Sequence, residues 1–279
     1  MARRRRLTGG CTVAILFGGC GDVLAPRPAP LFTVPLAIND TDVGEAIIDT
    51  GGGYEVILRE TFGLRIVGEV EILAFGGFET VAMTEGFGYS VGGWNAEADT
   101  ALVGLSVCDC NGVGFDFFRK TGVVLGVDFA THTATFGPVG PIGGVVLPFA
   151  PPPPMLANFD SAFIEVDILS GGGRTTVLGL LDTGTNASVM RRSLAAGATP
   201  VSRDRANVLV DHPELGTVAA SVLLFDTPGL PDIILGTDIM RAWSDEWYFF
   251  FAERGGTVTT FPRYDVGEGS SPAARASAE

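Results

Sequence analysis

The chain has 279 residues, a length that suits one large all-β unit or two lobes of about 110 to 130 residues each. Hydrophobic residues make up 46% of it, and together with 39 Gly and 19 Phe they indicate a packed, turn-rich protein rather than a disordered chain. The formal net charge of −14, from 18 Lys and Arg against 32 Asp and Glu, argues against binding to nucleic acid and against attraction to anionic lipid surfaces.

Residues 1–20 have the three parts of a targeting segment: the basic run Arg3–Arg6, a short apolar stretch, and small residues that end at Cys20. This segment resembles a bacterial lipoprotein signal peptide. The resemblance implies export to the cell envelope, on its periplasmic or outer-membrane face, a lipid on Cys20, and residues 21–30 as a tether. Contact with the membrane is then expected only through this anchor. Plain secretion and an uncleaved anchor are the alternatives.

Short runs rich in β-branched and aromatic residues, bounded by Gly, Pro or Asp, predict the strands of the first half. They cover residues 31–38, 45–49, 67–74, 80–84, 122–125 and 133–136. Four consecutive prolines then lie within residues 148–158, which predicts an extended linker between a first lobe, 31–147, and a second lobe, 159–264.

The second half repeats this plan and predicts an all-β protein. Its predicted strands cover residues 162–169, 175–182, 207–210, 217–225, 232–235, 246–252 and 257–261. Helix is predicted only over the short pieces 190–196 and 239–243. Residues 265–279, rich in Gly, Ser, Ala and Glu, are predicted to form a disordered tail.

Two elements occur once in each half and in the same order, which indicates an internal duplication. The first is Asp-Thr-Gly after an apolar run, at residues 49–51 and 182–184. The second is two apolar residues followed by Leu-Gly-x-Asp and another apolar residue, at 123–129 and 233–239. A single Asp-Thr-Gly arises easily by chance, but two copies, each followed by the same second element, do not.

These paired motifs resemble the aspartic peptidases over most of residues 31–262, with each lobe similar to a retropepsin-type subunit. The resemblance implies a bilobal, pepsin-like, all-β fold, with two pseudo-symmetric β-barrel-like lobes and the active site between them. Asp49 and Asp182 would then be the catalytic residues. The residues implied to support the two active-site loops are Thr50, Gly51, Thr183, Gly184, Thr185, Leu125, Gly126, Leu235 and Gly236.

The implied activity is that of an endopeptidase that hydrolyses peptide bonds in peptides or proteins. Two carboxyls about 3 Å apart cannot both ionise, so they share one proton and activate a water between them. This chemistry requires no metal and no organic cofactor. Since both loops lie in one chain, a monomer is expected; the alternative is that each lobe pairs with another chain.

The family covers its cleft with one or two β-hairpin flaps, which exclude water during the reaction. In the first lobe the flap candidate is the turn formed by Phe75, Gly76, Gly77 and Phe78. In the second lobe it is the turn at residues 211–216. An ordinary exposed hairpin is the alternative for each.

Gly52 is the main departure from the family pattern, because Ser, Thr or Ala usually follows the Asp-Thr-Gly. A hydroxyl at this place helps to hydrogen-bond the carboxylate, so the sequence predicts that Asp49 has less support and that water substitutes. The alternative function is a non-catalytic, surface-anchored peptide-binding or structural module that keeps the cleft. Retention of both aspartates argues against this alternative, because a mere cleft does not need two mutually repelling carboxyls.

Cys108 and Cys110 are the cysteines left outside the predicted signal. Two thiols and the distant His132 and His212 do not make a metal site, so no metal is expected. A disulfide between the two cysteines and a pair of free thiols in a loop both remain open.

Overall fold

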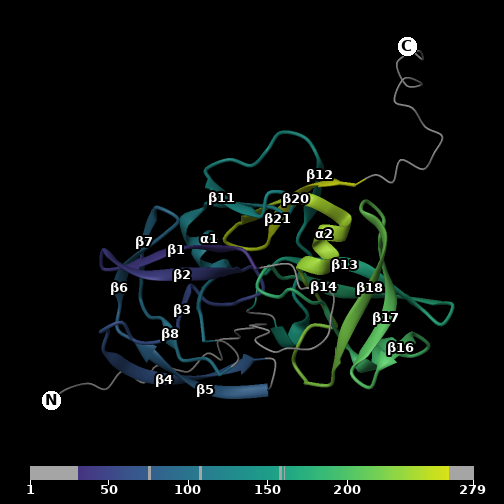
Figure 1. Ribbon diagram of the computed structural model, residues 1–279, viewed down its shortest axis with the longest axis horizontal. Helices are drawn as coiled ribbons and strands as arrows, with labels where there is room; N and C mark the ends of the chain where they lie inside the picture. The colour runs from purple at the N-terminus through teal and green to yellow at the C-terminus, as the bar shows by residue number, and fades with distance from the viewer. Residues whose placement is uncertain (1–30, 75–76, 107–108, 157–158, 160, 264–279) are drawn as a thin grey trace, which may run out of the picture.

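The computed structural model describes residues 31–74, 77–106, 109–156, 159 and 161–263. Most of these residues lie in β-strands, which confirms the predicted all-β class. The strands of the first half gather on one side of the molecule and those of the second half on the other, and a third group of strands lies above both (Figure 1). The molecule is therefore bilobal.

Within the described residues, the sheet of the first half contains nine strands. They are β1 (Thr33–Ile38), β2 (Thr41–Asp49), β3 (Val56–Leu58), β4 (Ile66–Ala74), β5 (Gly77–Thr84), β6 (Phe87–Val91), β7 (Trp94–Ala98), β8 (Leu102–Val103) and β9 (Asn111–Gly114). Their spatial order is β4-β5-β8-β3-β9-β2-β1-β6-β7. In β1, Val34, Leu36 and Ile38 are buried while the residues between them are more exposed, because side chains alternate along a strand.

The sheet of the second half contains seven strands and closes on itself. They are β13 (Phe163–Ser170), β14 (Gly173–Leu181), β15 (Val189–Arg191), β16 (Thr199–Ser202), β17 (Arg205–His212), β18 (Gly216–Phe225) and β19 (Ile233–Leu235). Their order is β13-β14-β19-β15-β18-β17-β16, and an additional pairing of β13 with β17 closes the barrel.

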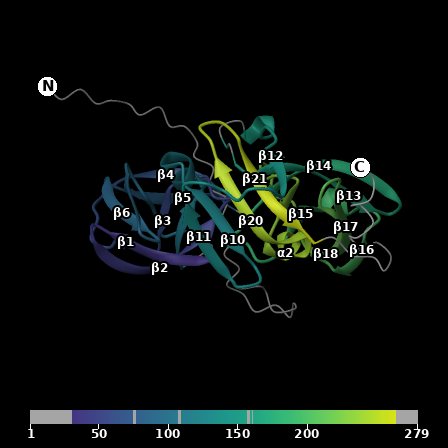
Figure 2. The same cartoon turned by 90° about the horizontal axis from the view of Figure 1, so that it is seen from above.

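A five-stranded sheet joins the two lobes. It has the order β11-β10-β20-β21-β12 and contains β10 (Val124–Asp128), β11 (Thr133–Gly137), β12 (Val145–Pro148), β20 (Ser244–Phe251) and β21 (Gly256–Pro262). Seen from above, β20 and β21 run through the middle of the molecule (Figure 2). Trp247, Phe249 and Phe251 of β20 are buried, so this strand contributes aromatic side chains to the shared core.

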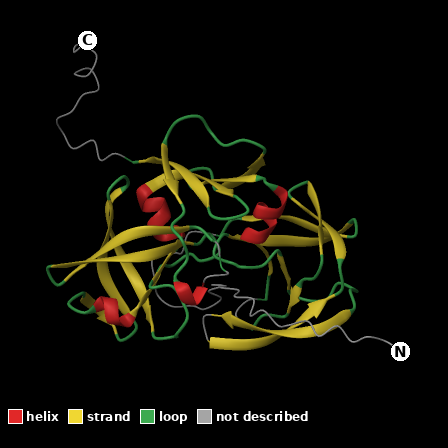
Figure 3. Cartoon of the chain, turned by 180° about the vertical axis from the view of Figure 1, so that it is seen from behind, coloured by secondary structure: helices red, strands yellow, loops and turns green. Residues whose placement is uncertain are grey.

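Each lobe contains the same unit, and this unit positions the site. A hairpin (β1–β2 or β13–β14) ends in an Asp-Thr-Gly loop, and a later short strand runs parallel to the second hairpin strand: β9 beside β2, and β19 beside β14. A helix follows at once, α1 (Phe115–Thr121) or α2 (Thr237–Trp243). Figure 3 shows these two helices on either side of the centre, beneath the joining sheet.

Several elements differ from the prediction. The helix expected at 190–196 is the end of β15 followed by a 3-10 turn, η2 (Arg192–Ala195). A second such turn is η1 (Pro154–Leu156), and Pro148 belongs to β12 rather than to a linker. Helix α1 was not predicted, and neither were the short strands β3, β6, β7, β8, β9, β12, β15 and β16, because two to five residues carry little periodicity.

Some predictions fall on residues outside the described part of the chain. They concern the signal 1–20 with Cys20, the tether 21–30, Phe75 and Gly76, Cys108, and the tail 265–279. They stay predictions. Within the described ranges, no helix is both long and apolar enough to cross a membrane.

Candidate active site

Two Asp-Thr-Gly loops meet between the lobes. Asp49 is the last residue of β2 and Asp182 directly follows β14, and both side chains are fully buried. A Cβ atom added to Gly51 would lie 2.5 Å from Cγ of Asp182. One added to Gly184 would lie 2.6 Å from Cγ of Asp49. Each carboxyl thus lies against the backbone of the opposite loop, where only glycine leaves room for it.

The threonines of the two loops exchange hydrogen bonds. The Thr183 N–H donates to Thr50 Oγ1 at 3.0 Å, and the Thr50 N–H donates to Thr183 Oγ1 at 3.2 Å. The Thr50 hydroxyl donates in turn to the carbonyl of Leu181 at 2.9 Å. The Thr183 hydroxyl donates to the carbonyl of Ile48 at 2.8 Å. These reciprocal bonds fix the two loops to each other across a pseudo-two-fold axis.

The two carboxyls interact strongly because they share one buried site. Burial, and then the charge of Asp182, raise the pKa of Asp49 well above its usual range. Burial also raises the pKa of Asp182, to about 6. Asp49 Oδ1 and Asp182 Oδ2 accept no hydrogen bond from any N–H or O–H group of the described residues. A single proton held between the carboxyls is the donor that this pair lacks.

Backbone groups support Asp182. The Gly184 N–H donates to Asp182 Oδ1 at 2.7 Å, and a backbone hydrogen bond from Gly51 also favours its charged form. The Thr185 hydroxyl does not reach this carboxyl, since it donates to the carbonyl of Ala187 at 3.0 Å. The side-chain support expected from Thr185 is therefore absent.

Strand β19 lies behind the second loop. The Asp182 N–H donates to the carbonyl of Leu235 at 3.0 Å, and the Thr237 N–H donates to the carbonyl of Thr185 at 2.9 Å. A Cβ atom on Gly236 would lie 3.0 Å from that same Thr185 oxygen, so a glycine fits where the strand passes into α2. Leu235 and Gly236 thus lie directly behind the Asp182 loop.

Leu125 and Gly126 do not lie behind the first loop, which corrects the expected role of both. They belong to β10 in the joining sheet, opposite Phe249 and Tyr248 of β20. The apparent repeat of residues 123–129 and 233–239 is therefore not a structural equivalence.

Strand β9 occupies the position expected for Leu125 and Gly126. It runs parallel to β2 and places Gly114 opposite Asp49. The Phe115 N–H donates to the carbonyl of Gly52 at 3.0 Å, the counterpart of the bond from Thr237 in the second lobe. A sequence signal exists, because residues 114–118 and 236–240 both read Gly-x-Asp followed by two apolar residues. Residues 126–130 carry nearly the same Gly-x-Asp pattern. Only the helix that follows Gly114, and does not follow Gly126, distinguishes segment 114–118 from segment 126–130.

Tyr54 is a site residue that the sequence did not reveal. Its hydroxyl donates to Asp49 Oδ2 at 2.8 Å, and its side chain is buried. Burial, and then the charge of Asp49, raise the pKa of this phenol well above its usual range, so it remains protonated and is a donor. Asp49 therefore has a hydroxyl partner despite Gly52.

The hairpin β4–β5 carries the flap candidate of the first lobe. Leu73 pairs with Phe78 and Ala74 with Gly77 next to the turn, whose residues Phe75 and Gly76 lie outside the described part. Phe78 is 64% exposed. A Cβ atom on Gly229 of the second half would lie 3.0 Å from Cδ2 of Leu73, so the end of this hairpin reaches the other lobe.

The turn at residues 211–216 is not a flap, which corrects the second candidate. His212 is buried beside Trp243, and the Trp243 indole N–H donates to the carbonyl of Gly216 at 2.9 Å. The turn thus packs on α2. The Asp182 loop lies near the other end of this hairpin, where the Leu223 N–H donates to the carbonyl of Ser188. In chain order, the counterpart of β4–β5 is β16–β17.

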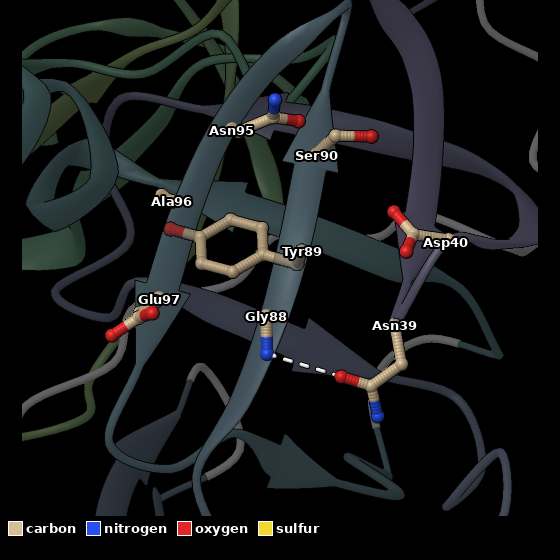
Figure 4. Close-up of a pocket in the computed structure, with 8 residues that line it drawn as sticks. All are labelled: Asn39, Asp40, Gly88, Tyr89, Ser90, Asn95, Ala96 and Glu97. Atoms are coloured by element: carbon tan, nitrogen blue, oxygen red, sulfur yellow. Dashed lines mark hydrogen bonds between the residues drawn. The ribbon is translucent and has the colours of Figure 1, made fainter.

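A surface hollow of about 450 Å³ lies on the first lobe, apart from the paired aspartates. Its lining residues are Asn39, Asp40, Gly88, Tyr89, Ser90, Asn95, Ala96 and Glu97. Figure 4 shows the hydrogen bond in it, which the Gly88 N–H donates to Asn39 Oδ1 at 3.2 Å. No residue of either Asp-Thr-Gly loop lines this hollow.

Cys110 forms a disulfide, while Cys108, its expected partner, lies outside the described residues. Within the described part of the chain, no group of three or more His, Cys, Asp or Glu side chains is arranged to bind a metal ion.

Comparison with known proteins supports the fold. No protein-family model matches the chain, and no curated protein is similar to it in sequence. Among solved structures, it is similar to the aspartic proteinase from Irpex lacteus, with a TM-score of 0.55 and 11% identity. The match covers 84% of this chain and 95% of that one. The chain therefore has the bilobal fold of a pepsin-like aspartic proteinase.

Proposed function

We propose that this chain is an aspartic endopeptidase in which Asp49 and Asp182 form one catalytic pair. The observation that supports this most directly is the reciprocal contact of the two loops, in which each carboxyl lies against the glycine of the other loop. A protein that needed only a cleft would gain nothing from burying two repelling carboxyls. The fold agrees with this proposal.

The proposed reaction needs no covalent intermediate. The charged carboxyl of the pair removes a proton from a water, whose oxygen attacks the carbonyl carbon of the peptide bond. The protonated carboxyl gives its proton to the carbonyl oxygen, which yields a tetrahedral diol. When the C–N bond breaks, the leaving nitrogen takes the proton that the pair had removed from the water, and one diol hydroxyl returns its proton to the pair, which again holds one proton. Asp49 Oδ1 and Asp182 Oδ2, which are free of other donors, are the oxygens proposed to act.

We propose that the substrate is an extended peptide segment bound between the lobes beneath the β4–β5 hairpin. Such a hairpin excludes water from the reaction when it closes. The exposed ring of Phe78, next to the turn of this hairpin, is a surface that an apolar side chain of the substrate could contact.

Cleavage of a peptide library by the full chain over pH 3 to 7 tests the proposal. Asp49→Asn and Asp182→Asn should each abolish cleavage, because neither residue can then share a proton with the other. The exposed Asp99→Asn is a matched control and should keep wild-type activity. Folded wild-type protein that cleaves no peptide at any of these pH values would contradict the proposal and favour a non-catalytic peptide-binding module.

A further inference from the structure

We propose that Tyr54 is a positioning residue of the active site, and that its hydroxyl takes the place of the one that Gly52 does not carry. This inference rests on the proposed function. It also explains why the first loop departs from the Asp-Thr-Gly-Ser or Asp-Thr-Gly-Thr pattern without leaving Asp49 unsupported. The bond from the Tyr54 hydroxyl to Asp49 Oδ2, 2.8 Å long and buried, is its starting point.

Three glycines make room for the tyrosine ring. A Cβ atom on Gly52 would lie 2.2 Å from Cε1 of Tyr54, and one on Gly112 would lie 2.7 Å from its hydroxyl oxygen. A Cβ atom on Gly114 would lie 3.0 Å from its Cδ2. A side chain at residue 52 and the ring of Tyr54 therefore exclude each other. This arrangement requires glycine at position 52, and the hydroxyl that this position lacks is supplied by Tyr54.

The backbone on both sides of Tyr54 is fixed to the junction of β9 and α1. The carbonyl of Gly52 accepts a hydrogen bond from Phe115, and the carbonyl of Glu55 accepts one from Gly114. The Glu55 carboxylate is itself held by the Tyr89 hydroxyl at 2.6 Å. The phenol thus approaches Asp49 from a rigid support, as a group that orients a carboxyl must.

The apolar surroundings of the ring connect it to the flap candidate. Tyr54 packs in a small cluster that is separate from the main core and includes strands β4 and β5. Its other buried members are Ile57, Ile72, Val81, Leu102 and Leu105. The ring therefore lies between the catalytic carboxyl and the hairpin proposed to cover the substrate.

The two carboxyls of the pair consequently have different partners. Asp49 accepts from the Tyr54 hydroxyl as well as from the backbone of Gly51, whereas Asp182 accepts from the backbone of Gly184 and Gly51. A donor to one oxygen of Asp49 favours the charged form of that carboxyl and leaves the other oxygen toward Asp182. Loss of this donor should move proton uptake by the pair to higher pH.

Tyr54→Phe tests the inference, because it removes one oxygen and keeps the ring. We expect kcat/KM to fall about 10- to 100-fold, as for the loss of one hydrogen bond to a charged group. We also expect the acid limb of its pH profile to move upward by roughly one unit. A purely structural role for the ring would leave that limb unchanged.

Gly112→Ala is a second variant that retains the phenol but displaces it, since the new methyl group would lie 2.7 Å from the hydroxyl oxygen. It should shift the acid limb in the same direction. Gly88→Ala in β6 is its matched control, because a Cβ atom there meets nothing closer than 3.8 Å. If Tyr54→Phe does not fold, Gly112→Ala tests the inference alone.

Carboxyl carbon NMR titration of the two aspartates separates this inference from the proposed function, since it does not require activity. Suppose that the wild-type protein cleaves nothing, but the Asp49 titration moves to higher pH in Tyr54→Phe. This result would overturn the proposed peptidase activity and leave the link between Tyr54 and Asp49 intact. Unchanged titration and an unchanged acid limb in an active enzyme would overturn the role of Tyr54 alone.

Discussion

The hydroxyls of Thr50 and Thr183 are small groups with a large structural effect. Each accepts a hydrogen bond from the opposite loop and donates one to a carbonyl at the end of the opposite strand. Removing one hydroxyl leaves a buried N–H and a buried C=O without partners, and this costs more than the bonds themselves contributed.

We predict that Thr50→Val lowers the free energy of unfolding by about 2 to 4 kcal/mol, because two buried backbone groups lose their partner. Thr50→Ser keeps the hydroxyl and should cost about 1 kcal/mol or less. Denaturant unfolding of both variants measures the difference. Equal stability of the two would mean that the hydroxyl bonds do not hold the loops together.

At the scale of elements, each Asp-Thr-Gly loop is supported by the short strand that lies behind it. In the first lobe this strand is β9, which is only four residues long and carries two of the glycines that surround Tyr54. Strand β10 instead links the lobe to β20 of the second half. Glycines in these two strands should therefore respond differently to substitution.

We predict that Gly114→Ala damages the site more than Gly126→Ala does. A Cβ atom on Gly114 would lie 2.2 Å from the carbonyl oxygen of Tyr54, a backbone atom that cannot move without displacing the loop. One on Gly126 would first meet Thr135 Oγ1, at 2.5 Å, which can rotate away.

Unfolding experiments and the titration of the two aspartates measure both effects. Gly114→Ala should cost about 1 to 3 kcal/mol of stability or more and should alter the titration. Gly126→Ala should leave the titration as in the wild type. The reverse result would restore β10 as the support of the first loop.

At the scale of the whole molecule, the meeting of two lobes buries two carboxyls in one place and so couples stability to pH. The folded-state pKa of each is raised, that of Asp182 to about 6, so the folded protein binds more protons than the unfolded chain. The contribution of the two carboxyls to the free energy of unfolding is most favourable below the ordinary aspartate pKa of about 3.9, and it is lost as pH rises toward about 6.

We predict that wild-type protein loses on the order of 1 to 3 kcal/mol of stability between about pH 4 and pH 6, relative to Asp49→Asn/Asp182→Asn. The double variant cancels the contribution of other titrating groups, which both proteins share. Unfolding free energies measured across this window give the difference curve. A flat curve would show that the pair does not titrate as a buried unit.

The sequence alone determined the features that depend on local pattern. Runs of β-branched and aromatic residues between Gly and Pro predicted the all-β class, and the two Asp-Thr-Gly copies identified Asp49, Asp182, Thr50 and Thr183 as one group. These features are readable because each is specified by neighbouring residues, and because the duplication makes a chance motif improbable.

Only the tertiary structure decided the partners of these residues. That Gly114 rather than Gly126 lies behind Asp49 depends on which short strand pairs with β2, and four residues carry too little periodicity to show it. That Tyr54 reaches Asp49 depends on space left by Gly112 and Gly114, which lie about 60 residues further along the chain. Contacts between segments so far apart are fixed by packing, which the pattern of neighbouring residues does not record.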